Sequence, residues 1–188
     1  MKQVILTLVL AFGLAGCAAN TPMTYLVLSP TVGSVYPVTG ANVAVGRVAM
    51  PPALDRSFLI TGRGENVLDI NDNAQWAAPL EGMAQTVLAR DLAARLPDRK
   101  VLMPGDDVPA SADIVSVNVI TFLPYPDRIV LEADWSMADA TGKVVQGGRV
   151  TITVPSSSPA EAQAQAMSQA LGQLADKVAG EIANSSQG

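Results

Sequence analysis

The sequence contains no histidine and a single cysteine, Cys17. Without histidine the chain cannot assemble a Ser/His/Asp or Cys/His catalytic group, and one cysteine cannot supply a His/Cys zinc site. No Gly-x-x-x-x-Gly-Lys-Ser/Thr segment is present to hold nucleotide phosphates. A disulfide within the chain is excluded too, so burial of apolar side chains must stabilise the fold. These absences exclude most familiar hydrolase, zinc-enzyme and ATPase mechanisms.

Basic side chains are also few. The chain carries 12 Lys and Arg against 17 Asp and Glu, a formal net charge of −5. Such a surface is poorly suited to nucleic acid or to electrostatic attraction by anionic lipid headgroups. In contrast, hydrophobic residues make up 49% of the sequence and the mean hydropathy is +0.29, which exclude gross disorder. We therefore expect a packed domain that does not bind nucleic acid.

The first residues have the pattern of a signal peptide. Lys2 is the only charge before an apolar run of 11 residues from Val4 to Leu14, and Ala15 and Gly16 lead to Cys17. A membrane-spanning helix needs about 20 apolar residues, so this run serves export. The sequence Leu14-Ala15-Gly16-Cys17 resembles the lipobox of bacterial lipoproteins. It predicts a signal peptide over residues 1–16, cleavage before Cys17 and acylation of that cysteine.

An ordinary secretory peptide cleaved nearby is the alternative, and it would leave Cys17 as a free thiol. A lone exported thiol is a liability, which weighs against this reading. Residues 17–23 are short, small and polar and are interpreted as a lipidated tether. At about 3.3 Å per residue, the tether would hold one domain, residues 24–188, within roughly 25 Å of the bilayer. The residue after the cysteine is Ala18 and not aspartate. By resemblance to lipoprotein sorting in two-membrane bacteria, this favours the periplasmic face of the outer membrane.

Periodicity predicts an α/β (mixed α+β) fold, a single domain with a mixed, largely antiparallel sheet packed by two main helices, about 80–96 and 159–183. Both helical segments repeat apolar residues at the i, i+3, i+4 spacing. In the segment 129–137 apolar and polar residues alternate, which predicts a strand with one wet face. The expected strands are 24–28, 42–50, 57–61, 66–70, 101–103, 112–123, 129–137 and 144–154, with 57–61 and 66–70 forming a hairpin around residues 62–65 and a Pro/Gly/Ser-rich loop over 29–40.

Few polar residues have the spacing of a catalytic or metal-binding site. Asp69, Asn71 and Asn73 match the opening of a calcium loop, yet Ala74 and Leu80 replace the required glycine and glutamate. We interpret this segment as a polar loop leading to the first helix. A carboxylate enzyme is left open by four acidic residues, although solvated surface carboxylates are favoured: Asp106, Asp107, Glu132 and Asp134. We therefore assign no catalytic residue, no metal ligand and no cofactor.

Two longer motifs carry a family resemblance. The first is Val48-Ala49-Met50-Pro51-Pro52-Ala53-Leu54-Asp55-Arg56, and the second is Trp76-Ala77-Ala78-Pro79-Leu80, which opens the first helix. Together with Ala133-Asp134-Trp135 and the closing Ala-rich helix, this order resembles the PqiC-like auxiliary lipoproteins of MCE-type ABC transport systems. The resemblance covers nearly all of residues 25–183. The chain departs from the family at Ala53, where an aromatic residue is usual.

The resemblance implies a non-enzymatic outer-membrane lipoprotein that docks to a periplasmic MCE-domain protein. That complex would move phospholipids or other hydrophobic molecules between membranes, with energy from a separate ATPase, and the lipoprotein could form a homo-oligomeric ring. Candidate interface residues are Leu54, Asp55, Arg56, Trp76 and Tyr125. Structural roles are the competing interpretations: core packing for Trp76, a local ion pair or a loop cap for Asp55 and Arg56, and a surface turn for Tyr125. The alternative function is a shuttle or receptor that itself binds a hydrophobic ligand in an apolar cavity.

Overall fold

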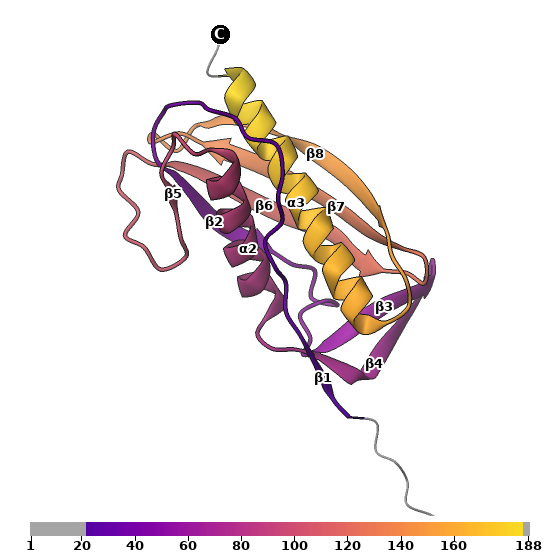
Figure 1. The fold of residues 1–188 in the computed structure, drawn as a ribbon. Coiled ribbons are helices and arrows are strands. Elements are labelled where there is room, and N and C mark those ends of the chain that lie inside the picture. The colour runs from indigo at the N-terminus through magenta and orange to yellow at the C-terminus, as the bar shows by residue number, and fades with distance from the viewer. Residues whose placement is uncertain (1–21, 186–188) are drawn as a thin grey trace, which may run out of the picture.

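The structure, a computed structural model, describes residues 22–185. The predicted signal peptide and Cys17 therefore lie outside the described residues. Within these residues, two helices and eight strands follow one another (Figure 1). They are β1 (Thr24–Leu26), β2 (Val43–Ala49), β3 (Phe58–Gly64), β4 (Val67–Trp76), α2 (Leu80–Arg95), β5 (Val101–Leu102), β6 (Asp113–Pro124), β7 (Arg128–Ala138), β8 (Val144–Pro155) and α3 (Ala160–Ser185).

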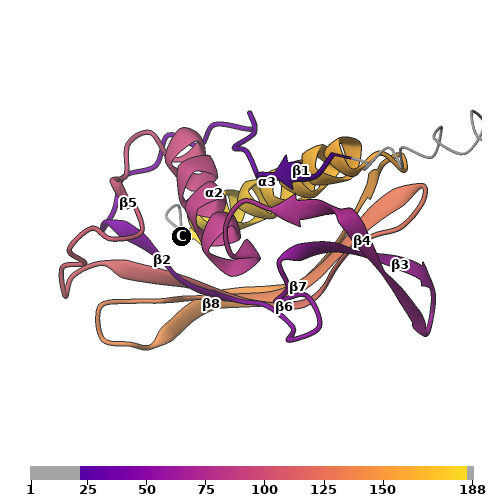
Figure 2. The same ribbon diagram turned by 90° about the horizontal axis from the view of Figure 1, so that it is seen from below.

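Five strands form the larger sheet, in the order β5-β2-β6-β7-β8. β2 is parallel to both of its neighbours, whereas β6, β7 and β8 run antiparallel to one another. Both helices cover one face of this sheet and leave the other face open (Figure 2). The predicted fold class, mixed α/β with two main helices in one domain, is confirmed. The strands divide between two sheets, however, because the hairpin pairs with β1 and not with the larger sheet.

The smaller sheet has the order β1-β4-β3. The polar segment at residues 69–73 was expected to be a loop, and this prediction is wrong, because β4 runs through it to Trp76. β4 pairs with β3 on one side and with β1 on the other, and this pairing outweighs the low strand propensity of Asp and Asn. β3 likewise continues through Gly64, so the hairpin turn is Glu65-Asn66, not residues 62–65.

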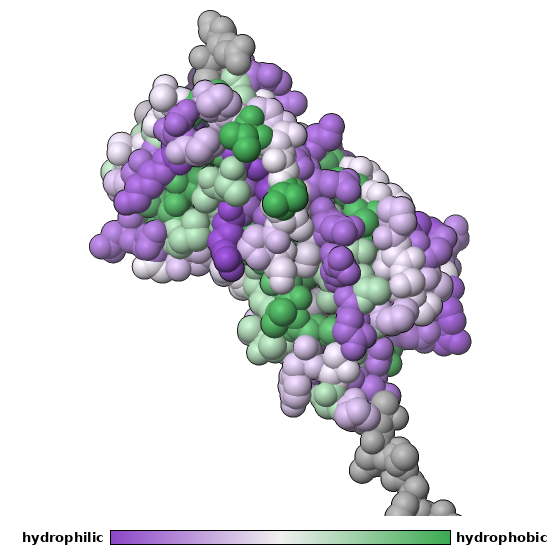
Figure 3. Space-filling model, in the orientation of Figure 1, coloured by the Kyte–Doolittle hydropathy of each residue, from purple (hydrophilic) through white to green (hydrophobic). Residues whose placement is uncertain are grey.

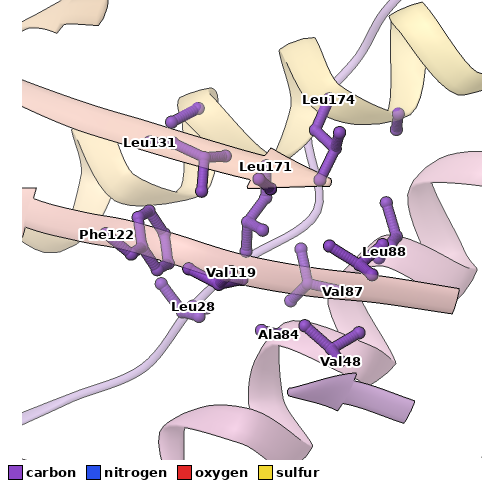
Figure 4. Close-up of a cluster of buried hydrophobic side chains, with 14 of the residues drawn as sticks. Leu28, Val48, Ala84, Val87, Leu88, Val119, Phe122, Leu131, Leu171 and Leu174 are labelled. Carbon is purple, nitrogen blue, oxygen red and sulfur yellow. The ribbon is translucent and has the colours of Figure 1, made fainter. Parts of the chain in front are cut away.

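The core lies between the larger sheet and the two helices. On β7 the predicted alternation is confirmed, since Ile129, Leu131, Ala133, Trp135 and Met137 are all buried. The predicted stripe of α3 packs onto this layer, and each of its members is at most 1% exposed: Met167, Leu171, Leu174, Val178 and Ile182. Figure 4 shows Leu131 of β7 and Phe122 of β6 beside Leu171 and Leu174. Removal of this apolar surface from water is the main stabilising contribution to the fold.

Residues 27–41, here called the strap, cross from β1 to β2 and pass between α2 and α3 (Figure 1). Its backbone is bonded to both helices: the N–H of Ser34 donates to Asp176 Oδ1 over 2.9 Å and that of Tyr36 to the carbonyl of Arg95 over 2.7 Å. Gly172 on α3 permits the close approach, because a Cβ there would overlap Thr31. The Pro/Gly/Ser-rich segment is thus irregular, as predicted, yet held in place along its length.

Arg95 lies at the centre of these contacts and is only 1% exposed. Its guanidinium donates to the carbonyl oxygens of Thr31 (3.1 Å) and Gly172 (3.0 Å), and to Asp176 Oδ1 (2.8 Å). Asp91, which is fully buried, accepts the N–H of Thr31 over 2.7 Å and lies 3.5 Å from Arg95. One arginine therefore joins the strap, α2 and α3, and balances the charge of a buried carboxylate.

Burial raises the pKa of Asp91 above its usual value of 3.8, against the opposing effects of the Thr31 N–H and of Arg95, while Asp176 adds to the rise. The native state thus binds this proton more tightly than the unfolded chain, so the stabilisation is present at acid pH and is lost as pH rises through the raised pKa. We expect the unfolding free energy of the wild type, relative to Asp91→Asn, to fall as pH increases from about 4 toward neutrality. Urea unfolding at a series of pH values measures this difference; a constant or rising difference would contradict the assignment.

Candidate functional site

The two motifs that carry the family resemblance meet in space. Pro51 and Pro52 end the pairing of β2, because proline cannot donate to a sheet, and the chain turns with the N–H of Leu54 donating to the carbonyl of Pro51 over 2.9 Å. The N–H of Trp76 then donates to the carbonyl of Ser57 over 2.7 Å. Residues separated by 19 positions in the sequence are thereby brought into direct contact.

A hollow of about 310 Å³ lies where the motifs meet, lined by residues 55–57 and 75–79. Leu54 and Trp76 are each 5% exposed and belong to the main core cluster. Their burial holds the segments that line the hollow in place. The structural role expected for Trp76, core packing, is therefore present.

Asp55 and Arg56 are both exposed at the rim of this hollow. The local ion pair expected between them is absent from the salt bridges of residues 22–185. Adjacent residues in an exposed turn point apart, and an exposed pair would stabilise the turn by less than about 1 kcal/mol. One carboxylate and one guanidinium consequently remain accessible beside the hollow.

Tyr125 lies elsewhere, in the turn between β6 and β7. Its ring packs against Gly62 of β3, where a Cβ would overlap it, and Arg128 stacks over the ring at 5.0 Å from the centroid. Gly62 is five residues along β3 from Ser57, a separation of about 17 Å at strand spacing. The structure thus groups Asp55, Arg56 and Trp76 but does not bring Tyr125 to the same hollow.

The acidic residues considered for catalysis lie in two separate pairs, Asp106 with Asp107 in a loop and Glu132 with Asp134 on β7 beside Arg149. Asp106 caps its own loop by accepting the N–H of Met103 over 2.9 Å, near the β5 edge of the sheet. Asp134 is bound by both guanidinium nitrogens of Arg149, at 2.7 and 2.9 Å, and these hydrogen bonds lower its pKa. A carboxylate held in its ionised form in this way is a poor general acid. Within residues 22–185 no three His, Cys, Asp or Glu side chains are grouped to hold a metal ion.

None of the helices between residues 22 and 185 is both long and apolar enough to cross a membrane. The sequence profile of the family described as "ABC-type transport auxiliary lipoprotein component" matches residues 25–179. The chain belongs to this family.

Solved structures share the fold. A crystal structure of a protein from Xanthomonas campestris has a TM-score of 0.68 and 18% identity, covering 86% of this chain and 96% of that one. Another, of an uncharacterized protein, has a TM-score of 0.67 and 19% identity, covering 87% and 98%. The chain matches none of the curated proteins with which it was compared. At these identities the structures establish a common architecture, and the family match establishes the role of transport auxiliary component.

Proposed function

We propose that this lipoprotein is anchored through acylated Cys17 to the periplasmic face of the outer membrane and docks to the MCE-domain protein of an intermembrane lipid transport complex. Docking would use the hollow formed by residues 55–57 and 75–79. The protein would act without catalysis and without a cofactor, and the ATPase would be a separate subunit.

The observation that carries this proposal is the position of the hollow. The N–H of Ala77, in its wall, donates to the carbonyl of Leu26 over 2.9 Å, so the hollow adjoins the first strand. Leu26 is nine residues beyond Cys17, at most about 32 Å of extended chain. Figure 1 places β1, the hairpin and the start of α2 at the same end of the domain, opposite the end of α3. A partner bound at the hollow would therefore meet the domain close to the membrane.

The alternative function, a shuttle that encloses a hydrophobic ligand, has less support. Between the larger sheet and the helices, where an internal cavity would form, the structure has a continuous cluster of buried side chains (Figure 4). A lipid would have to bind in a surface groove instead. Mass spectrometry of the native protein measures this directly, and a stoichiometric lipid would favour the shuttle over docking.

Site-specific photo-crosslinking tests the docking surface. With a photoreactive amino acid in place of Arg56 in the full-length acylated chain, we expect a crosslink to the MCE-domain protein in intact cells, because the side chain is exposed beside the hollow. Position 143 is the matched control. Lys143 is also exposed but lies in the turn before β8, whose Gln146 bonds to Glu181 near the end of α3. Equal crosslinking from both positions, or crosslinking from 143 alone, would contradict the proposed surface.

A further inference from the structure

Residues 23–27, which include β1, carry an apolar row on one side. Met23, Tyr25 and Val27 are 40%, 67% and 56% exposed, whereas the alternate residues Leu26 and Leu28 are buried at 3% and 7%. Successive side chains of an extended chain point to opposite sides, so the three exposed residues share one side. The outward row of a strand at a sheet edge is ordinarily polar. Here it is apolar along its whole length.

A groove of about 430 Å³ adjoins this row, between the segment from Tyr25 to Thr31 and the first half of α3. The helix contributes neutral side chains to the lining, Ala164, Gln165 and Gln169, and Glu161 is the one charged residue among the lining residues. Figure 3 shows hydrophobic side chains on the surface at this end of the molecule. The region is thus large, apolar in part and almost free of charge.

The anchor proposed above limits what can lie opposite this surface, and the following inference rests on it. Tyr25 is eight residues beyond Cys17, at most about 29 Å along the chain, and Met23 is closer still. Cys17 would carry acyl chains inside the bilayer. The outward row is therefore the part of the described domain with the shortest chain path to the lipid.

We propose that Met23, Tyr25 and Val27, with the adjoining groove, contact the outer-membrane bilayer and orient the domain on it. Tyrosine prefers the headgroup region, where its ring is shielded and its hydroxyl remains hydrated, and the flanking Met and Val would enter the acyl boundary. No basic side chain lines the groove, so this contact is apolar and insensitive to salt. The domain then presents the hollow of residues 55–57 and 75–79 beside the membrane surface.

Fluorescence quenching on vesicles tests this contact. The full-length acylated protein carries Val27→Cys, labelled with an environment-sensitive dye, on phosphatidylcholine vesicles containing spin-labelled lipid. Acylation occupies Cys17, so the introduced thiol is the one available for labelling. The control is Val144→Cys, which is similarly exposed at 61% but lies at the start of β8 near the opposite end. We expect quenching at position 27 to be several-fold stronger than at 144, and unchanged by high salt.

Failure of this inference can be told apart from failure of the anchor. A protein that does not float with the vesicles would refute the acylated anchor itself. A protein that floats but is quenched equally at 27 and 144 would overturn the membrane contact and leave the anchor standing. Dye protection at 27 without quenching, seen only after addition of an MCE-domain protein, would also overturn it and assign the row to a protein partner. Tyr25→Cys provides a second labelled position on the same row, with the same expectation as Val27→Cys.

Discussion

Replacing Arg95 with alanine is expected to lower the free energy of unfolding by about 3–5 kcal/mol. The substitution removes the cation nearest to Asp91, whose carboxylate is fully buried, and leaves that charge uncompensated. It also leaves the carbonyls of Thr31 and Gly172 without their donor. Each buried group that loses its partner keeps its desolvation cost, because water cannot fully replace the missing hydrogen bond. Urea denaturation followed by circular dichroism measures the change.

Arg90→Ala is the matched control, because Arg90 is on the same helix but exposed, and its loss should cost less than about 1 kcal/mol. Replacing the buried pair together, by Arg95→Met with Asp91→Leu, should be less destabilising than Arg95→Ala, since no charge is then left unpaired. The cost of Arg95→Ala should also be smaller at acid pH, where Asp91 takes up a proton. A cost equal to that of the control would show that the strap is held by other contacts.

The two helices and the strands of the larger sheet could be predicted because each encodes its own periodicity. The stripe from Met167 to Ile182 repeats with helical spacing, and β7 alternates cleanly between its two faces. In both cases one face contacts the core and the other contacts solvent, so the hydrophobic periodicity can be recognised within a single segment. The secondary structure of such segments can be predicted without knowing which elements they pack against.

β4 and the strap could not be predicted in the same way, because distant residues determine them. Asp69 and Asn73 are poor strand formers, yet they lie within β4, which pairs with β3 through residues 67–71 and 75 and with β1 through residues 74–76. A weak signal was present in Ala74 and Trp76, which alternate with polar residues and are both buried. For the strap, Arg95 and Asp176 are 81 positions apart, and no local pattern indicates their contact.

At the candidate site, the family resemblance singled out the two motifs, whereas their contact in space depends on the fold. The turn after Pro51 and the end of β4 are joined by the backbone bond from Trp76 to Ser57. The expected pairing of Asp55 with Arg56 is not among the salt bridges of residues 22–185, and both residues are exposed. Tyr125 was grouped with the site through its aromatic character alone, whereas its position depends on Gly62.

Cys17→Ala is expected to release the protein from the membrane and to abolish its contribution to envelope integrity. A single acyl chain gives only marginal, reversible binding, and the two or three chains of a lipoprotein make attachment effectively permanent, at about 0.8 kcal/mol for each buried methylene. Without them the outward row of β1 alone is too small to retain the domain at the bilayer. Fractionation of cells, with detergent sensitivity as the functional readout, measures both effects.

Ala18→Asp is the matched variant for Cys17→Ala, because it keeps the acylated cysteine and changes only the residue after it. We expect this variant to stay membrane-bound but to move to the inner membrane, as lipoprotein sorting implies, and to lose function as completely as Cys17→Ala. A strap variant such as Arg95→Ala should instead stay in the outer membrane at reduced abundance. Normal function of the released Cys17→Ala protein would refute the anchored role, whereas normal function of Ala18→Asp alone would show that attachment matters and the choice of membrane does not.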